Sequence, residues 1–542
     1  MRPWRPSRKS ARRALPESKS SLAMACYLTS TIKRAVQVNR NGVATIDGER
    51  KRTWTQVHDR VVRAAAMLKA LGVEAGDRVA VLALNGDRQF ELHFAIPWAG
   101  GALVPINTRL SPGEIQYVLE DSGARILFVD DANAPILDSM PDTVARVTVV
   151  SLGDMPRTGM EHYETLIADA SPVEDVARHG DDLAGIFYTG GSTGKSKGVM
   201  LSHDNLLVNA LNALIMFNYD QSTVYLHAAP MFHLTDGMAT YSITMAGGTH
   251  VFVPRFDPHA ALETISKNKV THVALVPTMV EMAVRQAEKG SYDISCLKQI
   301  AFGASPMPDA TLQRTIKIWP HVLMCHGWGL TELSPIGTNL PPEYRRPAVA
   351  GERLKSCGKP AMGLELRIVD ENDKEVPNGT VGEIVIRGPT VMMGYWNKPE
   401  ETAVALRGGW LHTGDAGYID DEGFVYIVDR LKDMIITGGE NVYSPEVESA
   451  ISQMPGVAGV AVIGVPHETW GEAVHAVIVT EPGVTLEAEA VIAHCKKKIA
   501  PYKSPRSVEF RTEPLPLSGA GKIFKRLLRE EFSKNRERPG SD

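Results

Sequence analysis

The sequence has few cysteines, and their positions follow no pattern. Five cysteines are scattered over 542 residues, at positions 26, 296, 325, 357 and 495. No two of them have the spacing of metal ligands or of a redox pair. Free thiols persist in reducing compartments, so the sequence favours a cytoplasmic protein.

Long apolar runs and an excess of positive charge are missing as well. A membrane helix needs about 20 consecutive apolar residues, and no segment of this chain supplies them. The formal net charge of -5 does not suit a general nucleic-acid binder, which needs a basic surface. We therefore expect neither an integral membrane segment nor a nucleic-acid partner.

Residues 1–25 are rich in arginine, lysine and serine, but no apolar signal core follows them. We interpret this segment as a disordered basic tail. A transit peptide is the alternative, and the sequence leaves open whether residues 1–23 belong to the native protein.

Short apolar runs that alternate with amphipathic segments fill the next part of the chain. Residues 54–71 have apolar side chains at helical spacing, and RVAVLAL (78–84) is the first apolar run of strand length. Similar runs follow at 124–130, 146–152, 183–188 and 272–277. This alternation predicts an α/β fold with mostly parallel sheets. A chain of this length is expected to form two or three domains.

The pattern changes near residue 358. Two predicted strands at 364–369 and 383–387 flank a Pro-Asn-Gly turn, and a third is expected at 424–428, which indicates a β-rich subdomain. Strands at 459–465 and 473–480 and helices from 445, near 486–499 and at 523–532 then predict a compact α+β unit. Its size suits a separate domain.

The strongest local motif is YTGGSTGKSKG at residues 188–198, between an apolar strand and a helix expected to begin near Ser202. Glycines let the backbone bend around phosphate oxygens, and the hydroxyl and lysine side chains supply donors. Thr189 stands where a Walker loop would need glycine, so this is not the usual NTPase loop. A flexible surface loop is the alternative.

Three further motifs have weaker signals when taken singly. HGWGLTE (326–332) offers an aromatic face for a purine and a carboxylate for magnesium, although a turn with a core tryptophan fits too. WLHTGD (410–415), with DRLKD (429–433), offers a carboxylate for ribose hydroxyls or a plain salt bridge from Asp415 to an arginine. PLSGAGK (516–522) ends in a lysine that alone would be read as solvated.

In this order, the four motifs resemble those of the adenylate-forming (AMP-binding) superfamily, in particular acyl-CoA synthetases similar to fatty-acid and 4-coumarate-CoA ligases. The resemblance covers residues 30–532. It implies a large N-terminal domain at 26–428 and a small mobile α+β lid at 434–535. It also implies a hinge at 429–433, and residues 536–542 would be a tail.

The resemblance also implies a role for each matching residue. The phosphate loop would comprise Thr189, Gly190, Gly191, Ser192, Thr193, Gly194 and Lys197, and the adenine and acyl pocket would be lined by Gly303, Ala304 and Ser305. Gly327, Trp328 and Gly329 would surround the adenine, Thr331 would contact the α-phosphate, and Glu332 would hold Mg²⁺. Asp415 and Arg430 would hold the ribose, Lys432 would be the hinge residue, Gly438 and Gly439 would lie near pantetheine, and Lys522 would be the catalytic lysine.

Several residues depart from the family pattern. Gly190, Ser192 and Ser196 replace the common Ser, Thr and Pro of the phosphate loop, Trp328 replaces Tyr, and His326 replaces a frequent Gln. His233 stands where amino-acid-activating relatives carry the Asp that pairs with the substrate ammonium, so an amino acid is not expected as substrate. The resemblance places His233 beside the acyl pocket, although a core histidine is the simpler alternative. The small, apolar stretch 237–248 would suit an acyl chain or an aromatic ring.

These features together predict an ATP-dependent acyl-CoA synthetase that uses Mg²⁺ and CoA and forms an acyl-adenylate. Its substrate would be a medium- or long-chain fatty acid or an aryl acid. The alternatives are an acyl-AMP ligase that loads a carrier protein, a sensor on an inactive synthetase scaffold, and a luciferase-like oxygenase. The sequence does not fix the oligomeric state, and a homodimer is compatible with it.

Overall fold

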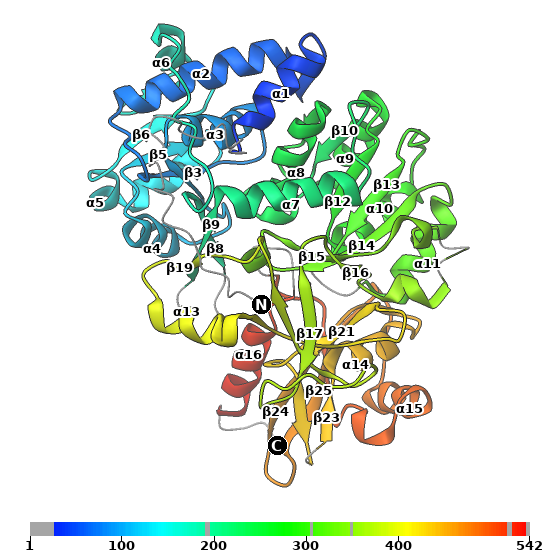
Figure 1. Cartoon of the computed structure of the whole chain (residues 1–542). Helices are drawn as coiled ribbons and strands as arrows, with labels where there is room; N and C mark the ends of the chain where they lie inside the picture. Colours follow the sequence, from blue (N-terminus) through cyan, green and yellow to red (C-terminus); the bar gives the residue numbers. More distant parts are fainter. Residues whose placement is uncertain are drawn as a thin grey trace, which may run out of the picture.

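The computed structural model describes residues 27–189, 196–303, 307–346, 349, 351–438, 440–517 and 523–537. These residues form two large mixed sheets, a small antiparallel sheet and a five-stranded sheet near the C-terminus (Figure 1). The predicted α/β class with a small C-terminal α+β unit is confirmed. None of the helices in the described part of the chain is long and apolar enough to cross a membrane.

The first large sheet is parallel from β8 to β7, and two antiparallel strands extend it at one edge. Its strands, in spatial order, are β19 (Gly394–Tyr395), β9 (Lys197–Ser202), β8 (Leu183–Thr189), β4 (Ala102–Pro105), β3 (Arg78–Leu82), β5 (Ile126–Val129), β6 (Thr148–Ser151) and β7 (Glu161–His162). The helices of this part of the chain are α1 (Ser30–Asn39), α2 (Trp54–Ala70), α3 (Asp87–Trp98), α4 (Pro112–Ser122), α5 (Pro141–Val144) and α6 (Tyr163–Asp169).

The second large sheet has a parallel centre and antiparallel edges. Its strands are β16 (Lys359–Pro360), β15 (Ile336–Asn339), β14 (Leu323–Gly329), β13 (Gln299–Phe302), β12 (His272–Leu275), β10 (Val224–His227), β11 (Thr249–Phe252), β1 (Val43–Asp47) and β2 (Arg50–Thr53). Its helices are α7 (His203–Met216), α8 (Leu234–Ala246), α9 (Pro258–Asn268), α10 (Pro277–Ala287) and α11 (Asp309–Ile318).

Helix α7 connects the two large sheets. It contacts β8 and β9 of the first sheet and β15 of the second, and it packs along α8 (Figure 1). The helix begins where the sequence predicts it, because Ser202 accepts a hydrogen bond from the backbone N–H of Asn205 (3.1 Å) and completes a capping box. Strand β9 was not expected. It pairs antiparallel with β8, so the phosphate-loop motif joins the two strands of a hairpin and does not lead directly into a helix.

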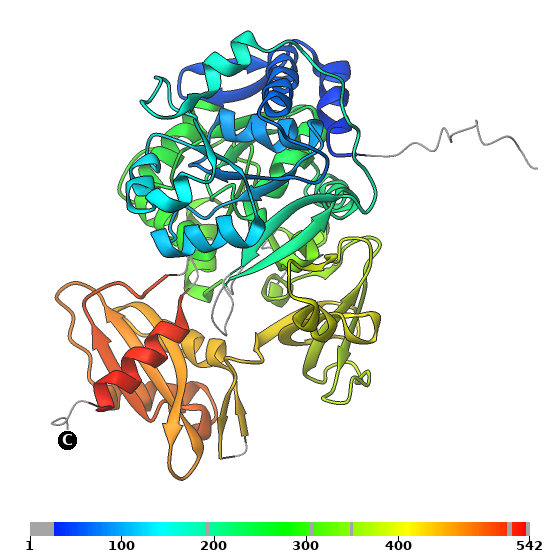
Figure 2. The same cartoon turned by 90° about the vertical axis from the view of Figure 1, so that its left-hand side faces the viewer.

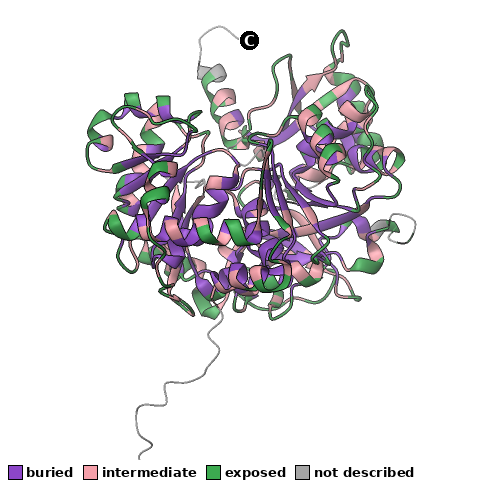
Figure 3. Ribbon diagram, turned by 90° about the horizontal axis from the view of Figure 1, so that it is seen from above, coloured by how far each residue is buried: buried purple, intermediate pink, exposed green. Residues whose placement is uncertain are grey.

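The predicted apolar strands are confirmed, with ends shifted by a few residues. The run 78–84 forms β3 (Arg78–Leu82), and 272–277 forms β12 (His272–Leu275). Strands in the middle of a parallel sheet are covered on both faces, which explains why they appear as unbroken apolar runs. Figure 3 shows buried residues along these strands and exposed residues on the outer faces of the helices.

The β-rich subdomain is an antiparallel sheet in the order β17 (Glu365–Val369), β18 (Gly382–Arg387), β20 (Leu411–Ile419) and β21 (Val425–Arg430). The hairpin predicted at 364–369 and 383–387 is therefore confirmed. Helix α13 (Pro399–Ala405) lies between β19 and β20 in the chain.

The C-terminal unit has a core of its own, which includes Ile435, Val462 and Ile478. Its strands are β22 (Ile435–Thr437), β23 (Glu440–Val442), β24 (Val457–His467), β25 (Gly471–Thr480) and β26 (Ser507–Arg511), and its helices are α14 (Ser444–Ser452), α15 (Ala488–Lys498) and α16 (Lys525–Glu537). Figure 2 shows this unit as a separate lobe below the larger domain. The predicted hinge, 429–433, comprises the last two residues of β21 and the first three residues of the connection to β22.

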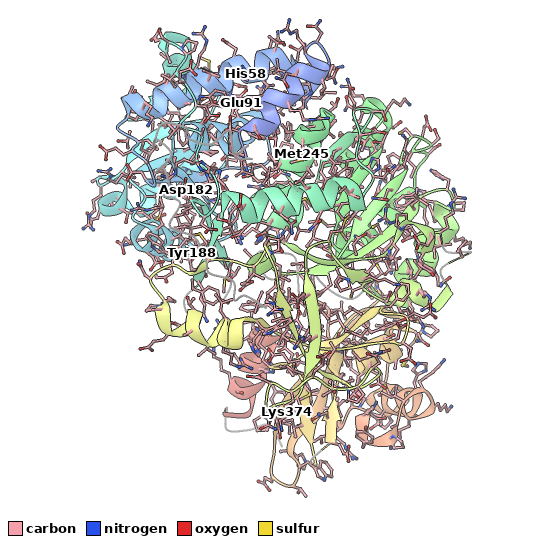
Figure 4. The ribbon with its side chains drawn as sticks, viewed as in Figure 1. His58, Glu91, Asp182, Tyr188, Met245 and Lys374 are labelled. Atoms are coloured by element: carbon pink, nitrogen blue, oxygen red, sulfur yellow. The ribbon has the colours of Figure 1, made fainter. Side chains whose placement is uncertain are left out.

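A buried ion pair holds α3 against α2. The carboxylate of Glu91 is fully buried and accepts hydrogen bonds from Arg60 Nε (2.6 Å) and from the Tyr163 hydroxyl (2.8 Å). Figure 4 labels Glu91 in the part of the molecule that α2 covers. A buried carboxylate is costly unless cations and donors surround it.

We predict that Arg60→Ala lowers the free energy of unfolding of this domain by about 3 kcal/mol, because it leaves the buried Glu91 without its cation. Arg63→Ala is the matched control. It removes the exposed pair with Asp59 (2.9 Å), expected to contribute less than about 1 kcal/mol, and a hydrogen bond to the backbone oxygen of Ala170 (2.8 Å), but it leaves no buried charge without a partner. Denaturant unfolding of both variants measures the difference, and equal effects would contradict this account of Glu91.

Candidate functional site

The ends of the phosphate-loop motif are fixed by side chains from outside the hairpin. Tyr188 in β8 donates to the carboxylate of Asp121 (2.6 Å), and Tyr117 in α4 donates to the backbone oxygen of Ser196 (3.1 Å). Figure 4 labels Tyr188 at the lower edge of the larger domain. Thr189 ends β8 and Lys197 begins β9. The five residues predicted between them as phosphate ligands (190–194) lie outside the described residues.

Glu332 lies in a short 3-10 turn, Thr331–Leu333, directly after β14. Its side chain accepts a hydrogen bond from the Tyr395 hydroxyl (2.9 Å), and its backbone oxygen accepts one from the N–H of Met392 (2.9 Å). The ammonium of Lys197 lies 4.8 Å from the centre of the Tyr395 ring. Tyr395 thus contacts two residues that the sequence assigns to the phosphate end of the site.

Helix α7 holds this turn in place. Asn209 donates to the backbone oxygens of Leu333 (3.0 Å) and Ile336 (3.2 Å), and Asn205 donates to that of Pro389 (2.7 Å). The sequence prediction missed these contacts. A signal for them exists, because asparagines at 205, 209 and 212 occupy one face of a helix, where such side chains have little reason to occur unless they bind backbone elsewhere.

Trp328 and Asp415 are brought together from distant parts of the chain. The indole N–H of Trp328 donates to Asp415 Oδ2 (2.8 Å), and both side chains are buried. Arg430 Nε lies 3.0 Å from Asp415 Oδ1. Asp415 and Arg430 face each other in neighbouring strands, β20 and β21. The salt bridge considered from the sequence therefore forms, and it joins two strands of the sheet.

The polar atoms of Asp415 are not all satisfied. Oδ2 accepts from the indole, but Oδ1 is buried without a hydrogen bond, because the approach of Arg430 lacks hydrogen-bond geometry. A buried oxygen without a donor is unusual in a folded protein. It can accept a hydrogen bond from a ligand hydroxyl.

Glycine is required where β13 and β14 end side by side. A Cβ on Gly303 would collide with the backbone oxygen of Gly327, and one on Gly329 would collide with that of Pro335. These predicted nucleotide-site glycines therefore allow close backbone packing. Ala304 and Ser305 lie outside the described residues.

His326 is held as a neutral side chain beneath this region. Its Nδ1–H donates to the backbone oxygen of Ser356 (2.7 Å), and its ring stacks on Phe302 with the centroids 4.8 Å apart. Burial lowers the pKa of His326 to about 4. Burial also raises the pKa of the Cys357 thiol, whose sulfur lies 3.9 Å from His326 Nε2, to about 12. Cys357, like the other three cysteines in the described part of the chain, is free.

The stretch predicted as an apolar lining contains more polarity than expected. Residues 237–248 are all buried, and His233 is the N-cap of α8. Next to the cap, the fully buried Asp236 contacts His227 Nδ1 (2.7 Å) and the Tyr225 hydroxyl (3.0 Å), and His227 contacts His250 (2.9 Å). Burial raises the pKa of Asp236 and lowers that of His250. The sequence did not reveal this network, because its members come from α8 and two different strands.

The hinge region is bridged by polar contacts. The Asp429 carboxylate accepts from the N–H (2.8 Å) and the hydroxyl (2.7 Å) of Ser444, and Arg529 pairs with Asp433 (2.9 Å). The predicted hinge residue, Lys432, is exposed. The buried carboxylate of Asp429 therefore lies at the joint between the two domains.

The residues predicted for the thiol-delivery side are separated from the other site residues. Gly438 lies in the turn between β22 and β23, where its N–H donates to the backbone oxygen of Trp470 (2.9 Å). The β22–β23 hairpin points away from the larger domain in both side views (Figures 1 and 2). Gly439 and Lys522 lie outside the described residues, although Leu517 and Ile523 form a bridge on either side of the Lys522 segment.

The described residues contain no cluster of three or more His, Cys, Asp or Glu side chains that could bind one metal ion. Glu332 is a single half-buried carboxylate. Such a group suits Mg²⁺, which usually takes one or two carboxylates together with substrate phosphates.

We predict that the free energy of unfolding falls less steeply with acid in His326→Gln than in the wild type. The folded-state pKa of about 4 lies below the ordinary value, so the stability from neutral His326 is complete above about pH 6.5 and is lost as the pH falls toward 4. The loss at pH 5 is about 2 kcal/mol per such histidine. Denaturant unfolding from pH 4 to 7 measures the slope, and His259→Gln at an exposed position is the control. An unchanged slope in His326→Gln would contradict the assignment.

Comparison with known proteins agrees with this geometry. A family model described as AMP-binding enzyme matches residues 32–396, and one described as AMP-binding enzyme C-terminal domain matches 446–522. The feruloyl-CoA synthase of an Amycolatopsis species is 38% identical over 500 residues, which is 92% of this chain and 98% of that protein.

Two solved structures extend the comparison. The anthranilate CoA ligase AuaEII in complex with anthranoyl-AMP has a TM-score of 0.87 at 29% identity, over 95% of this chain and 99% of its own. ATP-bound MatB from Rhodopseudomonas palustris has a TM-score of 0.85 at 32% identity, over 95% of this chain and all of its own. The apo form of the same MatB, at the same coverage, has a TM-score of 0.74. This chain therefore belongs to the AMP-binding enzyme family, and it is an AMP-forming acid–thiol ligase that uses ATP and CoA.

Proposed function

We propose that the protein activates a medium- or long-chain fatty acid or an aryl acid as its acyl-adenylate and transfers the acyl group to CoA. The observation that carries this proposal is the short segment from Trp328 to Glu332. At one end the indole holds Asp415, which has a buried acceptor oxygen left over, and at the other end Glu332 and Lys197 meet around Tyr395. A nucleotide that lies along this segment has its ribose at one end and its phosphates at the other.

Each end of this segment has a chemical role in the proposal. Asp415 accepts hydrogen bonds from the ribose hydroxyls, which gives Oδ1 a hydrogen bond in addition to its ion pair with Arg430. Thr331, Lys197 and the 190–194 loop surround the phosphates. Glu332 holds Mg²⁺, which when bound neutralises charge on the phosphate oxygens.

The proposed reaction then proceeds in two steps, adenylate formation and thioester formation. A carboxylate oxygen of the acid forms a bond to the α-phosphorus, and the bond from that phosphorus to the bridging oxygen breaks, so pyrophosphate leaves. The CoA thiolate then attacks the acyl carbon, and AMP leaves with the electron pair. In the first step the ammonium of Lys522 is proposed to stabilise the charge that develops on the transferred phosphate.

The arrangement of the domains supports a structure poised for the first step. The chain superposes better on ATP-bound MatB than on the apo form, and the β22–β23 hairpin with Gly438 lies away from the nucleotide site. We propose that a rotation about Lys432 brings this hairpin to the site for the second step and withdraws Lys522. Rearrangements of this kind are hinge motions between domains.

The acid is proposed to bind beside α8. His233, which caps this helix, offers no carboxylate for a substrate ammonium, and this disfavours an amino acid. Met238 and Ala239 of α8 belong to one apolar cluster with Ala274 and Ala301. Apolar walls with few polar groups are typical of sites for acyl chains and aromatic rings.

ATP–pyrophosphate exchange across a panel of acids tests this function. The panel contains short, medium and long fatty acids, cinnamates, benzoates, dicarboxylates and amino acids. We expect one fatty or aryl class to support exchange and, with CoA, to release AMP. Exchange without CoA consumption would favour transfer to a carrier protein, and exchange with amino acids alone would refute the proposal.

Lys522→Ala is predicted to lose adenylate formation by about 10²–10³-fold, which is the usual effect of removing one charge-stabilising donor. Thioester formation from preformed acyl-adenylate should be largely retained, because the proposal moves Lys522 away in that step. Lys497→Ala, at an exposed position of α15 in the C-terminal unit, is the control. Equal loss of both half-reactions in Lys522→Ala would contradict the domain rotation.

Trp328→Phe is predicted to raise the KM for ATP by about tenfold or more, since it keeps an aromatic face but removes the N–H that holds Asp415, a hydrogen bond to a charged group. The KM values for acid and CoA should change little. Trp410→Phe is the control, because Trp410 packs under Arg367 and Arg387 in the β-rich subdomain. An ATP dependence like that of wild type would show that the indole contact is not needed for ribose binding.

A further inference from the structure

We propose that Tyr395 is a positioning residue that presents Glu332 to magnesium-bound ATP and fixes it relative to Lys197. This inference rests on the proposed function, because it takes Glu332 as the metal carboxylate. Sequence motifs did not single out Tyr395, and neither its position nor its contacts follow from the Trp328 segment alone.

The side chain of Tyr395 uses two different parts to contact two charged groups. Its hydroxyl donates to Glu332 Oε1 (2.9 Å), while the face of its ring lies 4.8 Å from the Lys197 ammonium. The hydroxyl occupies one carboxylate oxygen and fixes the direction of the other. The cation–ring contact keeps Lys197 at the same place.

The backbone around Tyr395 is tied to the phosphate hairpin. In β19, Gly394 pairs with Met200 and Tyr395 with Val199, and the N–H of Trp396 donates to the oxygen of Gly198 (2.7 Å). Lys197, which precedes Gly198, therefore moves with Tyr395. Backbone pairing thus fixes the hairpin and Tyr395 relative to each other in this structure.

A second set of contacts fixes the other side of the segment. The N–H of Tyr395 donates to the hydroxyl of Thr402 in α13 (2.9 Å), and the Trp396 indole donates to the backbone oxygen of Asp121 (2.8 Å). Asp121 also binds Tyr188 through its carboxylate. Gly394 has φ +143°, and a Cβ there would lie 2.6 Å from Thr402 Cγ2, so the segment requires glycine at this position.

Glu332 is connected to the same segment at two points. Its carboxylate accepts from Tyr395, and its backbone oxygen accepts from Met392. Residues 392–396 thus bridge the turn that carries Glu332 and the strand that begins with Lys197. Placing a metal ligand through a hydrogen bond from a neighbouring residue is a general feature of metal sites.

Tyr395→Phe tests the role of the hydroxyl alone, since phenylalanine retains the ring under Lys197. Isothermal titration calorimetry measures ATP binding with Mg²⁺ and with EDTA for each protein. We expect the variant to bind ATP with Mg²⁺ about tenfold more weakly than wild type does, a typical effect for a lost hydrogen bond to a charged group. Its binding of ATP in EDTA should change by less than twofold. The ratio of the two affinities is independent of the folded fraction.

The Mg²⁺ dependence of the exchange rate and a double variant provide two further tests of the role of Tyr395. In the exchange reaction, Tyr395→Phe should require a higher Mg²⁺ concentration for half-maximal rate, and excess Mg²⁺ should restore most of the rate. Tyr426→Phe is the control, because that ring stacks on Tyr418 away from Glu332 (centroids 4.9 Å apart). In a Glu332→Gln background, the effect of Tyr395→Phe on the Mg²⁺ ratio should disappear.

The outcomes separate this inference from the proposed function. Pyrophosphate exchange by the wild-type protein tests the proposed function and does not depend on the role given to Tyr395. An unchanged ratio of ATP affinities, or additive effects of Tyr395→Phe and Glu332→Gln, would overturn the positioning role. If wild-type protein showed no exchange with any acid but Tyr395→Phe still altered Mg²⁺-dependent ATP binding, the proposed acid chemistry would fail and the positioning role would stand.

Discussion

Repulsion between two anions is the constraint on which this site depends. A carboxylate approaches a triphosphate more readily when positive charge and hydrogen-bond donors are already in place, because groups held in position need no reorganisation at the moment of reaction. The protein as a whole has a formal net charge of -5, so the compensation must be local. In the proposed function, the ammonium of Lys197 beside Tyr395 supplies part of it, and Mg²⁺ held at Glu332 would supply the rest. Their positions depend on the scaffold, since Asn209 of α7 binds the Glu332 turn and β19 binds the strand with Lys197.

The fold and the family were predictable because their signals are local or ordered along the chain. An apolar run of strand length such as 78–84 is typical of a strand covered on both faces, and the order of the four motifs assigns Trp328, Glu332, Asp415 and Arg430 to one proposed site. Strand β9 was harder to predict, because KGVMLS mixes polar and apolar residues and is a strand only through its pairing with β8. Tyr395 was missed for another reason. No sequence pattern distinguishes a tyrosine that packs from one whose hydroxyl meets a carboxylate 63 positions away.

The buried polar network behind α8 shows a further limit of sequence patterns. Asp236, His227 and His250 are fully buried and satisfy one another. Each side chain alone would be costly to bury, but the connected set is not, and it fixes α8 against β10 and β11 in one arrangement. His233 begins that helix. The network therefore fixes the start of the helix beside which the acid is proposed to bind, and its members Asp236, His227 and His250 all lie outside the stretch 237–248 that the sequence pattern singled out.

The division of polar contacts between the two domains gives the site both a rigid and a movable part. On the larger domain, Glu332, Lys197 and Asp415 are each held by at least one neighbour from another segment of the chain, so these groups keep their positions whatever the C-terminal unit does. On the C-terminal unit, Gly438 donates to the backbone of Trp470, which belongs to the same unit. The polar groups that cross the joint, Asp429 and Ser444, lie at the base of the hinge and not at the nucleotide. The proposed rotation about this joint would therefore exchange the groups presented by the small domain while Glu332, Lys197 and Asp415 stay on the larger domain. A two-step reaction on one bound intermediate requires that separation.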